Sequence, residues 1–254
     1  MLNRLRNLLL PCLGIALFLI VWEIAGRKMG DSLFAPLSSV VVQYVELLRD
    51  GAMLGELFIS LRQMLIGFLA ACVVGMPLGI AMGRSRLADA VFRPWVGIFV
   101  VTSTAALIPI LILILGTGLA LRSTVVFLAA VWYIVLTTYN GAKGISPEQI
   151  AVGRSFSAGR AQIFWKIILP TLYPYLITGA RIGLIHAIRA MVMAEMFVIV
   201  GYGGLIHQTG MLVDTSSLLG LLATLMIVSL LANFLLSQWG KTLAPWYEQQ
   251  RSTQ

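Results

Sequence analysis

Four long stretches of this chain carry no charged residue, and their length constrains the fold more than any other feature. They lie at 63–83, 94–118, 123–142 and 217–240. A helix needs about 20 mostly apolar residues to cross the hydrocarbon core of a bilayer. Since lipid offers no partner for unpaired backbone groups, spanning segments must satisfy their own hydrogen bonds. We therefore expect an all-α membrane protein.

Two further stretches are apolar but not free of charge. Residues 8–26 carry Glu23, and residues 174–200 carry four ionisable side chains. The first resembles a signal peptide, but its apolar run continues without a small-residue cleavage pattern, which favours an uncleaved span. We expect six spans in a single transmembrane domain covering residues 1–254.

The overall composition excludes several classes of protein. Hydrophobic residues make up 59% of the chain and charged residues 11%, with a mean hydropathy of +0.93, whereas soluble domains carry about 25% charged residues. The formal charge of +8 then fits loops beside an anionic membrane, and no nucleic-acid partner is expected. Neither Cys12 and Cys72 nor the two histidines are spaced as metal ligands or as a disulfide framework. We expect no metal site.

The basic residues predict the orientation of the chain. With the N-terminus inside, twelve Lys and Arg fall on the inner segments and five on the outer segments. Both termini are therefore expected in the cytoplasm. On the outer side, residues 36–51 predict an interfacial helix that begins near Pro36 and Ser38 and ends at Asp50-Gly51.

The longest inner segment, about 143–171, is expected to form two short helices. Ser146-Pro147-Glu148 is a helix start with a capping hydroxyl, a proline in the first turn and an acid near the positive helix end. Ser157-Ala158-Gly159 breaks this helix, and a second helix runs from about Arg160 until Pro170 ends it.

The same segment resembles the coupling loop of binding-protein-dependent ABC importer permeases. The resemblance rests on Ala151-Val152-Gly153, Ser157-Ala158-Gly159-Arg160 and Ile167-Ile168-Leu169-Pro170. It continues at Thr178-Gly179-Ala180-Arg181, Ala194-Glu195-Met196 and Gly201 to Leu205, and is strongest toward permeases for sulfonates, taurine and nitrate. Ala151-Val152-Gly153 replaces the Glu-Ala-Ala of the family pattern, and Ser157 replaces its usual glycine.

This resemblance implies a type I ABC importer permease in a prokaryotic inner membrane, with coupling helices between spans four and five. It implies two ABC ATPase subunits that carry ATP and Mg, a periplasmic or lipid-anchored solute-binding protein, and a second permease copy, so that no enzymatic activity is expected here. The chain itself has no phosphate-binding Gly-x-x-x-x-Gly-Lys-Ser/Thr loop. The coupling residues implied are Glu148, Ala151, Val152, Gly153, Ser157, Ala158, Gly159, Leu169 and Pro170.

Steric reasoning supports this role, because small side chains at such a loop allow a moving ATPase to approach the backbone closely. The alternative from the residues alone is an ordinary amphipathic loop that lies on the membrane surface.

The fifth span carries the most unusual chemistry. Ionisable residues are costly inside a membrane and usually face the bundle interior or a wet cavity. His186 and Arg189 share a helix face, whereas Glu195 lies about a third of a turn away. Arg189 therefore needs a counter-charge from another helix, a second subunit or a solute.

We accordingly predict a translocation path at His186, Arg189 and Glu195 for a small anion such as a sulfonate, taurine, nitrate or a carboxylate. Two alternatives remain: a permease for a vitamin precursor or another neutral or aromatic compound, and an ion-coupled secondary transporter. A structural role for Arg189 is the competing interpretation of that residue.

Overall fold

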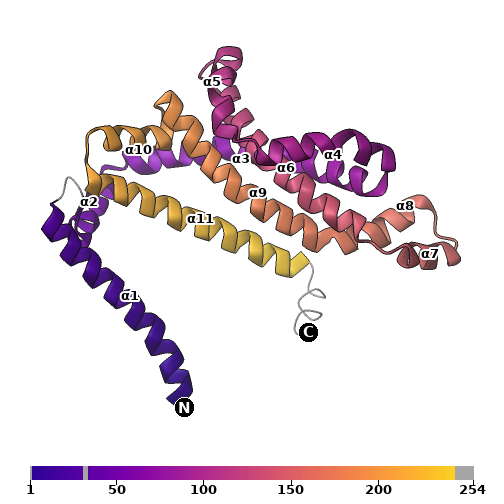
Figure 1. Ribbon diagram of the computed structural model, residues 1–254, viewed down its shortest axis with the longest axis horizontal. Coiled ribbons are helices and arrows are strands. Elements are labelled where there is room, and N and C mark those ends of the chain that lie inside the picture. The colour runs from indigo at the N-terminus through magenta and orange to yellow at the C-terminus, as the bar shows by residue number, and fades with distance from the viewer. Residues whose placement is uncertain (1, 31–33, 244–254) are drawn as a thin grey trace. The chain divides into compact units, whose positions relative to one another are not determined.

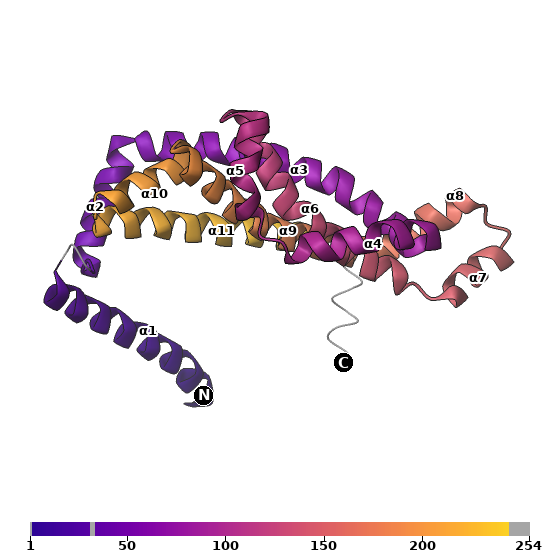
Figure 2. The ribbon, with the colours of Figure 1, turned by 45° about the horizontal axis from the view of Figure 1, so that its top comes forward.

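The computed structural model describes residues 2–30 and 34–243 (Figures 1 and 2), and all regular structure in these ranges is helical. The prediction of an all-α protein is confirmed. The helices are α1 (Leu2–Met29), α2 (Leu37–Asp50), α3 (Ala52–Arg84), α4 (Arg86–Val101), α5 (Thr104–Leu115), α6 (Leu119–Lys143), α7 (Pro147–Ser155), α8 (Arg160–Ile163), the π-helical turn η1 (Phe164–Ile168), α9 (Leu169–Val198), α10 (Gly201–Met211) and α11 (Thr215–Leu243). The chain forms two compact units, Met1–Ile59 with Ile199–Ile227 and Ser60–Val198 with Val228–Gln254.

Four helical segments among the described residues are long and apolar enough to cross a membrane. They are Ala52–Arg84, Leu119–Lys143, Arg160–Val198 and Thr215–Gln238, and they contain most of the predicted spans 63–83, 123–142, 174–200 and 217–240. The predicted span 8–26 lies within α1, and the side chains at its start, including Cys12, lie outside the described residues. Six spans remain a prediction.

The predicted span 94–118 is not one continuous helix. The chain leaves the helical conformation at Thr102 and Ser103, and α5 turns by 101° from α4, as Figure 1 shows. Thr102 is the C-cap of α4, and its N–H and its hydroxyl both donate to the carbonyl of Ile98, at 3.0 Å and 2.9 Å. The 12 residues of α5 extend for only about 18 Å, less than the thickness of the hydrocarbon core.

Glycines bring the neighbouring helices of the larger unit into close contact with α6. Four glycines of α3 lie on one face, and a Cβ added at Gly79 would approach the carbonyl oxygen of Val135 to 2.7 Å. On α9, a Cβ at Gly183 would lie 2.8 Å from Ile134. Small residues are typical of helix contacts in membranes, where packing replaces the hydrophobic driving force. Consequently α6 is the most buried long helix of this unit, and α9 runs beside it (Figures 1 and 2).

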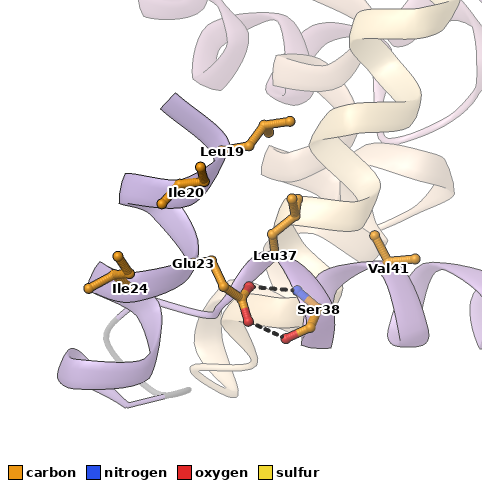
Figure 3. Close-up of a pocket in the computed structure, with 7 residues that line it drawn as sticks. All are labelled: Leu19, Ile20, Glu23, Ile24, Leu37, Ser38 and Val41. Carbon is orange, nitrogen blue, oxygen red and sulfur yellow. Dashed lines mark hydrogen bonds between the residues drawn. The ribbon is translucent and has the colours of Figure 1, made fainter. Parts of the chain in front are cut away.

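In the smaller unit, α1 caps α2. The Glu23 carboxylate accepts the backbone N–H of Ser38 at 3.1 Å and its hydroxyl at 2.9 Å, beside an apolar groove between the two helices (Figure 3). We expected Ser38 to help start this helix, but Pro36 is the N-cap residue and has no capping side chain. The carboxylate of Glu23 supplies the missing acceptor. The predicted end is confirmed, with Gly51 in the left-handed region at φ 73°.

Candidate functional site

A cavity of about 320 Å³ lies where the break between α4 and α5 faces α6 and α9. Two of the three residues predicted for the translocation path, His186 and Arg189, line it. Glu195, the third, is fully buried in α9 and is not among the lining residues. The lining residues are Phe99, Val100, Val101, Thr102, Ser103, Thr104, Ala105, Ile108, Val125, Leu128, Ala129, Tyr133, His186, Arg189, Ala190 and Met193.

Aromatic stacking fixes the polar end of this cavity. The ring of Tyr133 on α6 stacks on the His186 ring, with centroids 3.7 Å apart and planes 9° from parallel. The Tyr133 hydroxyl donates to the Val100 carbonyl at 3.4 Å, just before the break that ends α4. Three helices therefore meet at one stacked pair, which holds the imidazole at the cavity wall.

Arg189 lies about one turn further along α9 and is exposed. Arg189 lines the cavity, and it is not part of the ion pair between Arg27 and Glu23 that the described residues show. Arg181 on the same helix differs, because its Nε donates to Asn233 Oδ1 of α11 at 3.0 Å. Arg181 therefore joins α9 to α11, whereas Arg189 lies at the cavity and is exposed among the described residues.

The inner loop begins as predicted. Ser146 caps α7 by accepting the N–H of Gln149 at 3.4 Å, and Pro147 occupies the first turn. The pKa of Glu148 lies below its usual range, because its own backbone N–H and the Ser146 hydroxyl donate to the carboxylate. The acid is fully ionised at neutral pH, where it complements the positive end of the helix.

The second helix of the loop does not end at Pro170. Helix α8 continues through η1 into α9, so one helical segment runs from Arg160 to Val198. A proline lacks an N–H for the usual bond four residues back and crowds that carbonyl. The π turn absorbs the irregularity, with the Leu169 N–H bonded to the Phe164 carbonyl five residues earlier. The inner loop and Arg189 are thus joined by a single helix, over about 43 Å.

The small residues of the loop divide into two groups. Gly153 is buried, and a Cβ there would lie 2.5 Å from Cδ1 of Ile167; Ala158 packs against the apolar cluster around Ile163 and Leu172. These two residues are small because of packing inside the loop, which differs from the close approach to a partner that we expected for them. Ala151 and Gly159 are exposed, and a Cβ at Gly159 would meet nothing within 4 Å.

The loop also exposes three large apolar side chains, of which only Val152 was expected at the coupling surface. Phe156 is 82% exposed, Trp165 66% and Val152 57%. The sequence feature that could have indicated this exposure is an aromatic residue directly before the Ser157-Ala158-Gly159 bend, where the chain leaves helix α7. Exposed aromatic side chains on a rigid element are typical anchors of protein interfaces.

The bend places Ser157 in a conformation that favours glycine. Ser157 has φ 55°, the Ala158 N–H donates to the Gly153 carbonyl, and the Ser157 N–H donates to the Arg154 carbonyl. These bonds form a Schellman motif, in which the left-handed residue is usually glycine. A serine pays a steric cost there that glycine avoids.

We therefore expect Ser157→Gly to stabilise the loop by about 1 kcal/mol. Hydrogen exchange of the α7 amides should slow by roughly fivefold, since 1.4 kcal/mol corresponds to a factor of ten. Gly159→Ala, at a glycine with ordinary φ and open space, is the matched control and should leave exchange almost unchanged. Faster exchange in Ser157→Gly would contradict this account of the bend.

Comparisons with known proteins identify the family of this chain. Residues 75–249 match the family model of the binding-protein-dependent transport system inner membrane component. A probable ABC transporter permease protein of Brucella abortus is 31% identical, over 96% of this chain and 98% of that protein. The taurine transport system permease protein TauC of Escherichia coli is 26% identical over 89% of this chain and 85% of its own. The nitrate import permease protein NrtB of Synechocystis is 31% identical over 74% and 71%.

The fold is also shared with a solved structure. A chain of the MetNI methionine ABC transporter, in an inward-facing conformation, superposes with a TM-score of 0.66 at 22% identity and covers 75% of this chain and 95% of that one. At this identity the likeness shows the fold, which is that of a type I ABC importer permease. The chain therefore belongs to the family of binding-protein-dependent transport system inner membrane components, the permeases of ABC importers.

Proposed function

We propose that this permease forms the path by which an ATP-driven importer carries a small anion across the membrane. The observation that carries the proposal is Arg189, whose guanidinium lines the 320 Å³ cavity beside the Tyr133–His186 stack. A fixed positive charge in a membrane segment is costly, and residues of this kind usually mark ion and substrate pathways. An anion in the cavity would offset that cost, because attraction between charges is stronger where the effective dielectric constant is below that of water.

The names of similar proteins support an anionic solute. They include permeases of taurine, nitrate and bicarbonate transport systems. All three solutes are anions or contain an anionic group. For this chain, a sulfonate or a carboxylate fits the guanidinium, which presents its donors in a fork that matches paired oxygen atoms.

The partners and the orientation belong to the same proposal. The exposed coupling-loop residues, Glu148, Ala151, Val152, Ser157 and Gly159, would contact an ATPase dimer that holds ATP and Mg, while Gly153, Ala158, Leu169 and Pro170 would shape the loop. The exposed Phe156 and Trp165 add anchors to that surface. A second permease copy and a solute-binding protein complete the importer. The excess of basic residues on the inner segments supports an inner-membrane location with both termini in the cytoplasm.

Uptake into proteoliposomes tests this function. Permease, ATPase and binding protein would be reconstituted so that the ATPase faces the vesicle lumen, which contains ATP. A labelled alkanesulfonate would be added outside the vesicles. We expect ATP-dependent accumulation that unlabelled sulfonates and carboxylates inhibit and that uncharged alcohols of equal size do not. Equal inhibition by the alcohols would instead favour a permease for neutral compounds.

A further inference from the structure

The cavity at Arg189 has a polar end and an apolar end. The pairing of α6 with α9 shows in which order the lining residues follow one another between these ends. The two helices run antiparallel, because Tyr133 stacks on His186 while Gly141, further along α6, packs against Tyr175, earlier in α9. Residue numbers thus rise along α6 as they fall along α9. From the Tyr133–His186 level, the next lining positions are Ala129 with Ala190, and then Val125 with Met193.

The chemistry changes along this direction. The level of Tyr133 and His186 also holds Val100, whose carbonyl accepts the Tyr133 hydroxyl. Val100 lies two residues before the hydroxyl-bearing break at 102–104. Arg189 lies within one turn of this level. Leu128 and Val125 lie five and eight residues back along α6, about 8 Å and 12 Å away, and Met193 lies one turn beyond Arg189 on α9.

The cavity is larger than a small inorganic anion requires. A volume of 320 Å³ equals that of about ten water molecules in the liquid, and it lies within the range of pockets that enclose small organic ligands. Nitrate or bicarbonate has four non-hydrogen atoms and would fill only the region around the guanidinium. The apolar half would then lack any contact with the solute.

From these observations the geometry points to an organic anion with an apolar body as the occupant, and it assigns chain-length selection to Leu128 and Met193. The anionic group lies against Arg189 and the hydroxyls of Ser103 and Thr104, while the alkyl or aryl body extends toward Val125. This inference rests on the proposed function, because it specifies the solute of the same path. An anionic lipid shares the chemistry of a charged group on an apolar body, so the experiment separates a membrane lipid from a free solute.

Equilibrium binding to the permease–ATPase complex, without the binding protein, tests the inference. The complex would be held in nanodiscs of phosphatidylcholine, and labelled ethane-, butane- and hexanesulfonate would be titrated against empty nanodiscs. Each buried methylene should tighten binding about threefold to fourfold, and nitrate should compete far more weakly than butanesulfonate. Adding phosphatidylglycerol to the nanodiscs should leave binding unchanged; displacement of the sulfonates by this lipid would assign the cavity to lipid and overturn the inference.

Variants of the apolar wall provide the decisive comparison. Met193→Ala should move the preference toward longer sulfonates, and Leu128→Phe should move it toward shorter ones. Ile185→Ala, at an exposed position of α9 outside the cavity, is the matched control and should leave the preference unchanged. Chain-length dependence that is equal in all four proteins, or nitrate binding as tightly as hexanesulfonate, would overturn the inference.

These outcomes are distinguishable from a failure of the proposed function. If nitrate and sulfonates bind equally and Arg189→Gln removes both, the anion path stands and only the apolar body is rejected. If butanol binds as tightly as butanesulfonate, the anion path itself is rejected together with this inference.

Discussion

Replacing Arg189 with glutamine is expected to lower solute uptake at least about tenfold while the permease still assembles with its ATPase. A hydrogen bond to a charged group contributes about 1.5–3 kcal/mol, and 1.4 kcal/mol corresponds to a factor of ten in an equilibrium constant. The side chain is exposed to the cavity and makes no ion pair in the described part of the chain, so its loss should not disturb packing. Arg189→Lys keeps the charge but not the planar fork, and should retain intermediate uptake.

The matched control is Arg181→Gln, which makes the same change on the same helix outside the cavity. Because Arg181 is bonded to Asn233 across two helices, this variant should reduce the yield of assembled permease without changing the KM of the molecules that do assemble. Uptake is to be measured at equal amounts of assembled complex. Wild-type uptake of an anion by Arg189→Gln would contradict a role of Arg189 in attracting the solute.

Replacing Phe156 with aspartate is expected to abolish stable association with the ATPase and, with it, transport. The ring is 82% exposed at the end of α7, so the change removes an interface contact and leaves the fold intact. Aromatic anchors at interfaces contribute 2 kcal/mol or more, and a buried carboxylate without a partner adds a desolvation cost. Binding should weaken by well over tenfold, measured by copurification and by titration of the detergent-solubilised permease with ATPase.

Phe156→Leu keeps an apolar side chain and should retain most of the binding. Membrane insertion of both variants should equal that of the wild type. A Phe156→Asp permease that still copurifies with its ATPase and transports normally would show that the coupling surface lies elsewhere on the molecule.

Uncharged length predicted α3, α6 and α11 from sequence, because spanning a bilayer is a requirement on a single segment. It did not predict the break at Thr102 and Ser103, since hydroxyl side chains also bond to carbonyls inside continuous helices. After Thr102 the chain turns by 101° and α5 packs against α6 and α9, and one uncharged stretch does not encode contacts with such distant segments. The expectation that Pro170 ends a helix failed for a related reason, because the π turn before it relieves the local conflict.

Only the ionisable residues of the candidate site could be predicted from the sequence. The cost of an ionisable group in lipid singled out His186 and Arg189, and the structure places both at one cavity. Their neighbours come from helices 50 or more positions away in the chain: Tyr133 stacks on the imidazole, and the hydroxyls at 102–104 line the same cavity. Such contacts follow from the antiparallel register of α6 and α9, which glycine packing determines and which no single segment encodes.

The most direct test of the central claim is ATP-driven uptake of a labelled organic sulfonate by the reconstituted importer. An ATPase subunit that binds ATP but cannot hydrolyse it serves as the control, with and without a proton gradient across the vesicle membrane. We expect accumulation with the active ATPase and none with the inactive one, whether or not the gradient is present. Accumulation that follows the proton gradient and needs no ATP hydrolysis would contradict this expectation and would favour an ion-coupled transporter.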